Sequence, residues 1–275
     1  MIGSEPEGDL ALVLQGSPRM SAFVCEGVVD GMFTLGRARG ASACDALVAT
    51  ALTELDRFGV ARAGIAVEEG DAAAHAALTN HAERFFAIGE VDPHAGMPEL
   101  RRLEGLARAY GLRAVTVSPS LLRPPLAIDD RRFYPVFAKC VELDVAICPS
   151  LGVPAERVPL WPQKVERIDE VACRFPELRI VMKHGCEPWQ ALAVLLMRKH
   201  ANLFYLASAL RPTRIPPEIV AFANEDGAHK ILFASHPPAG VPREQIWKEL
   251  PEAGFARSVW PRFLRDNAFR VFRLS

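Results

Sequence analysis

The segment RIVMKHGCEPW, residues 179–189, has the pattern of a buried strand that leads through a turn into a helix. Residues 180–182 form the apolar run of the strand, and Lys183 and His184 follow at its end. A helix is predicted to open at the next residues and to extend over 188–200. Polar side chains at the carboxyl end of a buried strand are where an α/β barrel places its chemistry. The segment therefore predicts a barrel strand with His184 at its functional end.

The same alternation of strand and helix repeats along most of the chain. Strands separated by helices of ten or more residues pair in parallel through crossover connections. The strands are apolar on both faces, as a parallel sheet covered by helices requires. The pattern predicts an α/β fold, a single (β/α)8 TIM barrel over residues 1–275. An open doubly wound sheet is the alternative, but no glycine-rich phosphate turn follows any strand. The predicted strands are residues 10–14, 61–67, 85–91, 113–117, 145–148, 179–182, 203–207 and 230–234.

The N-terminal part has the weakest pattern. Residues 1–9 are expected to be a loose tail, and residues 10–14, LALVL, are the candidate for a degenerate first strand. Residues 19–40 contain four glycines in a mixed stretch and are predicted to be a loop arm. The first regular helix is expected over residues 42–58, where Ser42 is a suitable N-cap.

Composition and charge exclude several classes of protein. A net charge of −1 and a pI near 6.7 give no electrostatic footprint for nucleic acid or for an anionic membrane surface. No segment approaches ~20 uninterrupted apolar residues, so no membrane span is expected. The N-terminus, MIGSEPEGD, is acidic where a secretory signal is basic, which predicts a cytoplasmic protein. Self-association into a homo-oligomer stays open. The six cysteines lack CxxC pairing and are expected to be free thiols.

Six segments carry a resemblance to a known family. They are FAIGEVDP (86–93), DDRRFYPVFAKCVELDVAI (129–147), RFPELRIVMKHGCEPW (174–189), KHANLFYLAS (199–208), KILFASHPP (230–238) and DNAFRVF (266–272). In order and spacing they resemble the amidohydrolase-related family, the branch of the amidohydrolase superfamily that includes aminocarboxymuconate-semialdehyde decarboxylase-like proteins. The resemblance implies a (β/α)8 barrel, in agreement with the alternation of elements.

The resemblance also implies a metal site, from which this sequence departs. In the family, an HxH motif on the first strand, a histidine on the fifth and an aspartate on the eighth hold a divalent metal, often zinc. A histidine on the sixth strand is the acid/base, and His184 matches it. The fifth-strand position is Cys148 in ICPS, the eighth is His236 in ASHPP, and the fourth is Ser118 in TVSP; LALVLQGSP contains no histidine. We therefore expect no metal at the family position and no other cofactor.

The expected function follows from the groups that remain. His184 and His236 are the predicted catalytic pair, because neighbouring histidines with separated pKa values divide acid and base roles. Ser118, Cys148 and Glu90 are the predicted substrate-binding residues. Together, the catalytic pair and the substrate-binding residues predict a metal-independent hydrolase or C–C lyase of the decarboxylase type. Its expected substrate is a small carboxylated, lactone or aromatic compound. Two alternatives stay open: a rearranged zinc site of Cys148, His184 and His236, and an inactive barrel that binds a ligand or stabilises a partner.

Strand alternation yields one further expectation about this site. Side chains of a strand point alternately to its two faces. If His184 faces the barrel interior, Met182 shares its face and Lys183 points toward the surrounding helices or the rim. An ion pair is then the expected role of Lys183.

Overall fold

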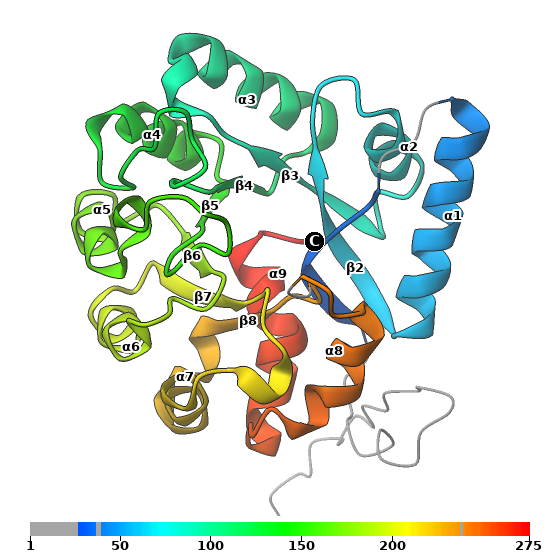
Figure 1. The fold of residues 1–275 in the computed structure, drawn as a ribbon. Coiled ribbons are helices and arrows are strands. Elements are labelled where there is room, and N and C mark those ends of the chain that lie inside the picture. Colours follow the sequence, from blue (N-terminus) through cyan, green and yellow to red (C-terminus); the bar gives the residue numbers. More distant parts are fainter. Residues whose placement is uncertain (1–26, 37–39, 237–238) are drawn as a thin grey trace, which may run out of the picture.

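Eight parallel strands, each paired with the next along the chain, form the centre of the molecule. The computed structural model describes residues 27–36, 40–236 and 239–275. Every pairing between consecutive strands is parallel. Figure 1 shows the strands as a ring viewed along its axis. They are β1 (Val28–Phe33), β2 (Val60–Val67), β3 (Phe85–Glu90), β4 (Ala114–Val117), β5 (Ala146–Pro149), β6 (Ile180–Lys183), β7 (Leu203–Ala207) and β8 (Ile231–Phe233).

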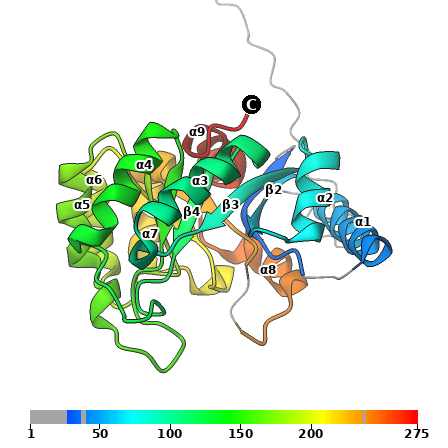
Figure 2. The same ribbon diagram turned by 90° about the horizontal axis from the view of Figure 1, so that it is seen from above.

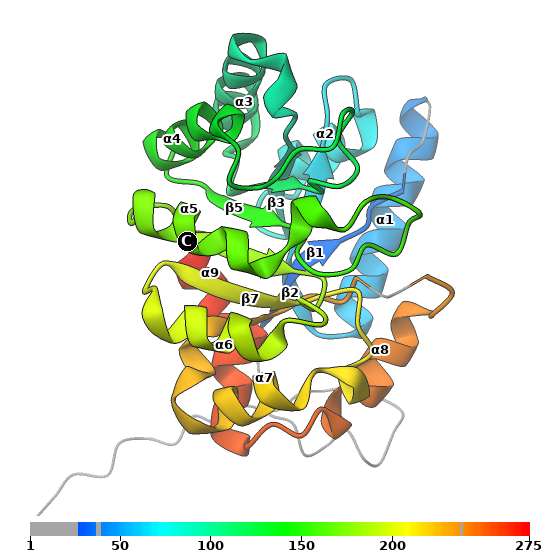
Figure 3. The ribbon, with the colours of Figure 1, turned by 60° about the vertical axis from the view of Figure 1, so that its left-hand side comes forward.

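Helices connect the strands and cover the outside of the ring (Figures 1, 2 and 3). The starts and ends of several are set by local chemistry. The Asp71 side chain accepts a hydrogen bond from the Ala74 amide at the start of α2, and Gly111 ends α3 in the left-handed conformation. The helices are α1 (Ala41–Arg57), α2 (Ala72–Asn80), α3 (Met97–Tyr110), α4 (Tyr134–Glu142), α5 (Ile168–Arg174), α6 (Gln190–Lys199), α7 (Pro217–Phe222), α8 (Arg243–Glu249) and α9 (Asn267–Val271).

The (β/α)8 barrel predicted from the sequence is confirmed, but its first strand is not the predicted one. β1 lies at Val28–Phe33, inside the segment 19–40 that was expected to be a loop arm. That expectation is wrong for this part of the segment. The predicted tail, 1–9, and the predicted strand, 10–14, lie outside the described residues. β1 reads VVDGMF and, like LALVL, contains no histidine.

A side chain joins the first and last strands of the barrel. Among the described residues no backbone ladder links β1 to β8. The buried Asp30 carboxylate instead accepts hydrogen bonds from the Ser235 amide (2.9 Å), the Ser235 hydroxyl and the Met32 amide (3.1 Å). Burial raises the pKa of Asp30 to about 6, and these hydrogen bonds oppose the rise. This Asp30–Ser235 contact closes the seam of the barrel, which is the junction between β1 and β8.

The barrel interior is filled below its carboxyl end. Alternate residues of the strands point inward and pack with the C-terminal segment, as Phe86 does against Phe272 with ring centroids 5.4 Å apart. The inward set includes Val29, Ile88, Ala114, Cys148, Val181, Phe204, Leu206 and Leu232. Figure 1 shows the end of the chain in the middle of the ring. The amino ends of the strands are therefore closed by apolar packing.

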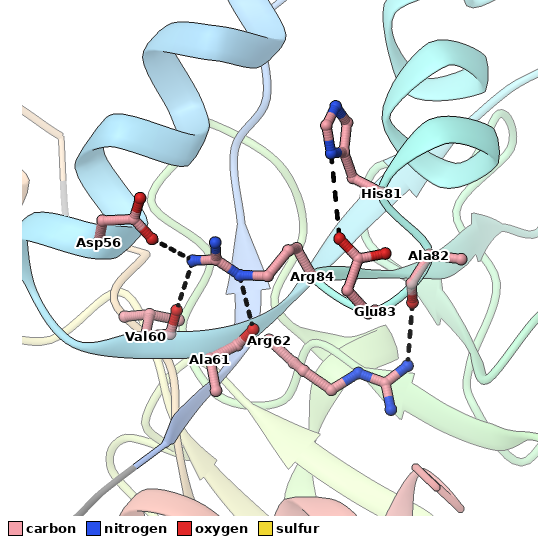
Figure 4. Close-up of polar contacts among 8 residues, drawn as sticks. All are labelled: Asp56, Val60, Ala61, Arg62, His81, Ala82, Glu83 and Arg84. Atoms are coloured by element: carbon pink, nitrogen blue, oxygen red, sulfur yellow. Dashed lines mark hydrogen bonds and ion pairs between the residues drawn. The ribbon is translucent and has the colours of Figure 1, made fainter.

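Arg84 links the amino end of the barrel to its first helix through hydrogen bonds. Its guanidinium donates to the carbonyls of Val60 (3.0 Å) and Ala61 (3.0 Å) at the start of β2, and to the Asp56 carboxylate on α1 (2.7 Å), as Figure 4 shows. Arg62 donates nearby to the Ala82 carbonyl (3.2 Å). These contacts lie at the amino ends of the strands, opposite the carboxyl ends at which a barrel of this kind places its functional site. No helix in the described part of the chain is long and apolar enough to span a membrane.

Candidate active site

A cavity of about 350 Å³ opens at the carboxyl ends of the strands. Its walls combine an apolar patch with hydroxyl, carboxylate, imidazole and amine groups. Such a mixture in a concave site is typical of small-molecule binding. The lining residues come from β1 and the loop after it (Met32, Phe33, Thr34, Leu35, Gly36), from β2 to β4 and the segments that follow them (Ala66, Glu68, Asp71, Ile88, Glu90, Thr116, Ser118), and from the end of β6 and the segments after β6 and β8 (Lys183, His184, His236).

Lys183 and His184 both face this cavity, which corrects the expectation from strand alternation. Val181 packs in the barrel interior and Met182 packs toward the helices, so Lys183 is the next inward residue of β6. His184 follows with φ of 68°, a left-handed conformation that breaks the alternation and turns its side chain to the same side. The prediction that Lys183 points outward into an ion pair is therefore wrong.

The imidazole of His184 lies between an amine and a hydroxyl. Its Nε2 lies 3.1 Å from Lys183 Nζ, and its Nδ1 lies 3.3 Å from the Ser208 hydroxyl, which also accepts the His184 backbone N–H at 3.2 Å. Burial, with the positive charge of Lys183 and the nearby His236, lowers the pKa of His184 well below its usual range. His184 is thus held neutral at pH 7, with a ring nitrogen available to accept a proton.

His236 is the second imidazole of the cavity. The ring centroids of His184 and His236 are 5.7 Å apart, and His236 Nδ1 lies 3.3 Å from the Thr34 hydroxyl. Burial, together with the charges of Lys183 and Arg243, lowers the pKa of His236. The predicted convergence of the two histidines on one cavity agrees with this geometry. Their catalytic roles stay a prediction.

Lys183 is the residue that sequence reasoning placed wrongly and that the geometry makes most prominent. Its side chain is 5% exposed, and among the described residues its polar contact is with His184 while no carboxylate pairs with it. Burial lowers the pKa of Lys183 to about 8, although Cys148, Glu90 and Glu156 oppose the shift. The only signal for Lys183 in the sequence was its position at the end of a strand. That position does not define which face of the strand its side chain occupies. Thr34 was also missed, because β1 was not recognised.

The three predicted substrate-binding residues differ in their access to the cavity. Ser118 lines it and shares a hydrogen bond of 2.9 Å with the Ser150 hydroxyl. Glu90 also lines it. Cys148 is buried among the inward side chains and is not part of the lining, and burial raises the pKa of its thiol to about 12. Ser118 and Glu90 thus remain candidates for substrate contact, whereas direct contact by Cys148 does not agree with this geometry.

The side chains at this place do not fit a divalent metal ion. The described residues contain no group of three or more His, Cys, Asp or Glu side chains arranged to hold one. Of the rearranged zinc set, Cys148 is buried among the inward side chains and is not part of the cavity lining. The amine of Lys183 beside His184 adds a positive charge that opposes a second cation. No reaction step is therefore assigned to a metal.

Residues 29–274 match the amidohydrolase family. The chain belongs to that family. The resemblance stated from six sequence segments is thereby confirmed. This amidohydrolase matches no curated protein in sequence.

Solved structures show where else the same barrel occurs. An uncharacterised TIM-barrel protein from Bordetella bronchiseptica is 18% identical, with a TM-score of 0.72 over 90% of this amidohydrolase and 98% of that chain. A 2,6-dihydroxybenzoate decarboxylase from Rhizobium is 16% identical, with a TM-score of 0.65 over 90% and 99%. A dihydroxybenzoic acid decarboxylase from Polaromonas, with bound manganese and the inhibitor 2-nitroresorcinol, is 14% identical, with a TM-score of 0.64 over 90% and 97%. At these identities the likeness shows the fold.

Proposed function

We propose that this amidohydrolase acts on a small molecule as a hydrolase or a C–C lyase, and that decarboxylation is the favoured reaction. The observation that carries the proposal is the convergence of two imidazoles and one amine, from His184, His236 and Lys183, on a single cavity. The position of the cavity at the carboxyl ends of barrel strands supports it, since enzymes of this fold place their chemistry there.

The proposed substrate is a carboxylated compound, and an aromatic or lactone ring suits the cavity. Phe33, Leu35 and Ile88 form an apolar wall against which a ring packs. Lys183 provides a positive charge for a carboxylate, and Ser118 provides a hydroxyl. The names of the similar Rhizobium and Polaromonas proteins, both decarboxylases of dihydroxybenzoates, favour the same class.

The two imidazoles divide the proton transfers. Loss of CO2 leaves an electron pair on carbon, which must be protonated. In the proposed reaction one imidazole delivers that proton and the other accepts a proton from the substrate. His184 is suited to accept, because its neighbours keep it neutral. His236, whose ring centroid lies 5.7 Å from that of His184, is the proposed donor after it takes up a proton from solvent. Both proton transfers are thus carried out by side chains of this chain.

A substrate screen tests the proposal. Carboxylated aromatic, muconate-like and lactone compounds are incubated with the protein, and CO2 release and ring opening are measured. Turnover that falls in His184→Asn but not in His229→Asn supports the proposal. Asparagine tolerates the left-handed backbone of residue 184, and His229 does not line the cavity. Turnover that is unchanged in His184→Asn contradicts the proposed roles.

The alternative is an inactive barrel that binds a ligand or stabilises a partner, and its scaffolding form predicts a cavity plugged by phenylalanine or methionine side chains. Met32 and Phe33 line the cavity but leave about 350 Å³ free. This geometry gives the alternative no support. Cytoplasmic location and self-association stay predictions from the sequence.

A further inference from the structure

We propose that Lys183 is a nucleophile that forms an imine with a carbonyl substrate, and that the substrate is a β-oxo acid. The proposal rests on the decarboxylation proposed above and names its substrate class and its covalent step. It assigns to Lys183 a role that neither the strand pattern nor the family resemblance implied.

The first support is the position of the amine. Lys183 ends β6 and lines the cavity, yet its side chain is almost completely buried. A buried lysine is ordinarily paired with a carboxylate. In the described part of the chain the polar neighbour of its Nζ is instead His184 Nε2 at 3.1 Å. The amine is thus directed at the place where a substrate binds, without an acidic partner to hold its proton.

The second support is the charge state that this environment favours. Desolvation lowers the pKa of Lys183 to about 8, so about a tenth of the amine is neutral at pH 7, against about one part in three thousand for an ordinary lysine. Only the neutral amine attacks a carbonyl, and desolvation is an established way of activating a lysine for imine formation. The neutral His184 beside it lies within hydrogen-bond distance of the amine and is placed to relay its protons.

The covalent steps balance without a redox partner. The Lys183 amine attacks the carbonyl carbon, the nitrogen proton passes through His184 to the oxygen, and a second proton, taken up from solvent, lets water leave to give a protonated imine. The bond to the carboxylate then breaks, CO2 departs, and the electron pair enters an enamine whose nitrogen is neutral. His184 or His236, after taking up a proton from solvent, protonates the enamine carbon. Water adds to the protonated imine and releases the ketone, the free amine and one proton. The sum is a β-oxo acid anion plus one proton, giving a ketone plus CO2.

A β-oxo acid fits this chemistry because its carboxylate is one carbon removed from the imine. The positive imine nitrogen is then placed to accept the electrons of the breaking bond, and the protein needs no other electron sink. Glu68 and Asp71 line the same cavity on its β2 side. They disfavour a carboxylate on that side and so favour binding with the carboxylate toward Lys183.

The competing role for Lys183 is that of a counter-ion, which holds a carboxylate without forming a bond. Arginine separates the two roles, because Lys183→Arg keeps the positive charge and removes the nucleophilic amine. Lys183→Met removes both and preserves an unbranched chain in the buried space. Lys164→Arg is the matched control, since Lys164 is more exposed and pairs with Glu166 at 3.7 Å outside the cavity lining.

The test is reductive trapping with acetoacetate and cyanoborohydride, followed by mass measurement of the intact protein and of its peptides. The expected result is one adduct on Lys183 with the mass of an isopropyl group, the trapped decarboxylated imine. 3-Hydroxybutyrate, which lacks the carbonyl, should give none. Lys183→Arg and Lys183→Met should lose the adduct, and Lys164→Arg should retain it. Trapping with acetone should reach half its maximal rate near pH 8, whereas surface lysines require higher pH.

Each other outcome has a defined meaning. No adduct on Lys183 of the wild-type protein, with acetoacetate or with oxaloacetate, overturns the imine. CO2 release from a carboxylated aromatic compound that persists in Lys183→Arg also overturns it, while leaving the proposed decarboxylation in place. An adduct that keeps the carboxylate, without CO2 release, supports the nucleophile and overturns the decarboxylation of a β-oxo acid. Circular dichroism of the variants establishes that loss of trapping is not loss of folding.

Discussion

The amine of Lys183 lies 3.1 Å from Nε2 of His184, although the two residues are neighbours in sequence and a regular strand would direct them to opposite faces. The left-handed backbone of His184 brings them together. Such a conformation costs free energy and persists where the surrounding structure supports it, often at functional sites. Here the Ser208 hydroxyl accepts the His184 backbone N–H and provides that support.

Replacing His184 tests its role as acid/base. We expect His184→Asn to lower kcat by about 10²–10⁴-fold on a substrate from the screen, the usual contribution of a general acid or base. The fold should persist, because asparagine adopts the left-handed conformation readily. Steady-state kinetics and thermal unfolding measure the two effects. An equal loss in His229→Asn, outside the cavity, would point to a nonspecific effect.

The pH profile tests the electrostatics of the same residue. Burial and the charge of Lys183 lower the pKa of His184, so the imidazole stays in its basic form at pH values where an ordinary histidine is protonated. In an NMR titration, the His184 imidazole of the wild type should stay neutral as pH falls through 6.5 and should take up a proton only well below it. In Lys183→Met, which removes the repelling charge, the protonation of His184 should move to higher pH. A His184 titration that is the same in both proteins would contradict this account.

His236 is expected to contribute less than His184. It hydrogen-bonds to Thr34 and does not contact the Lys183 amine in the way that His184 does. We expect His236→Ala to lower kcat by about tenfold to a hundredfold, at the low end of general acid/base effects. Thr34→Val, which removes the hydroxyl that orients the ring, should reproduce part of the loss. An effect of His236→Ala confined to KM would assign His236 to binding.

Asp30 should make the stability of the barrel depend on pH. Because burial raises its pKa from 3.8 to about 6, the folded protein holds this proton more tightly than the unfolded chain does. The stabilisation is complete below pH 3.8 and is lost as pH rises through about 6. From pH 4 to pH 8, Asp30→Asn should gain about 2 kcal/mol relative to wild type, because most of the pKa difference acts over this range. Urea unfolding across this range measures it, and a constant difference between the two proteins would refute the assignment.

Metal removal should leave the activity unchanged. Cys148 lies outside the cavity lining, and the positive charge of the Lys183 amine beside His184 opposes a divalent ion there. We expect dialysis against a chelator to alter neither kcat nor the melting temperature. Elemental analysis of the purified protein checks the premise. Stoichiometric zinc that survives dialysis and is lost in Cys148→Ser would establish the rearranged zinc site instead.

Most of the barrel was predictable because the hydrophobic pattern of its strands differs in period from that of its helices. Seven strands were located near their observed bounds, since each is an apolar run bordered by helices. The first was missed: Asp30 and Gly31 interrupt the apolar run of β1, whereas residues 10–14 are uniformly apolar and resemble a strand better. The function of Asp30 at the seam depends on Ser235, more than 200 residues away, and no local pattern reveals it.

The candidate site was predictable in its histidines but not in its amine. The strand-end positions of His184 and His236 placed them on one cavity through the barrel topology. The orientation of Lys183 was not available from the sequence, because both faces of β6 are apolar and alternation alone does not say which one faces the interior. The left-handed turn at His184, which places both residues on the same side, is likewise a consequence of tertiary contacts.

The packing of Phe272 and its neighbours beneath the cavity closes the site at its inner end. A ligand that enters at the carboxyl ends of the strands has to leave by the same route, and a product still in the mouth excludes the next substrate. Product and substrate therefore compete for one state of the protein. Slow departure of the product, more than slow chemistry, would then limit the turnover of a tightly binding compound.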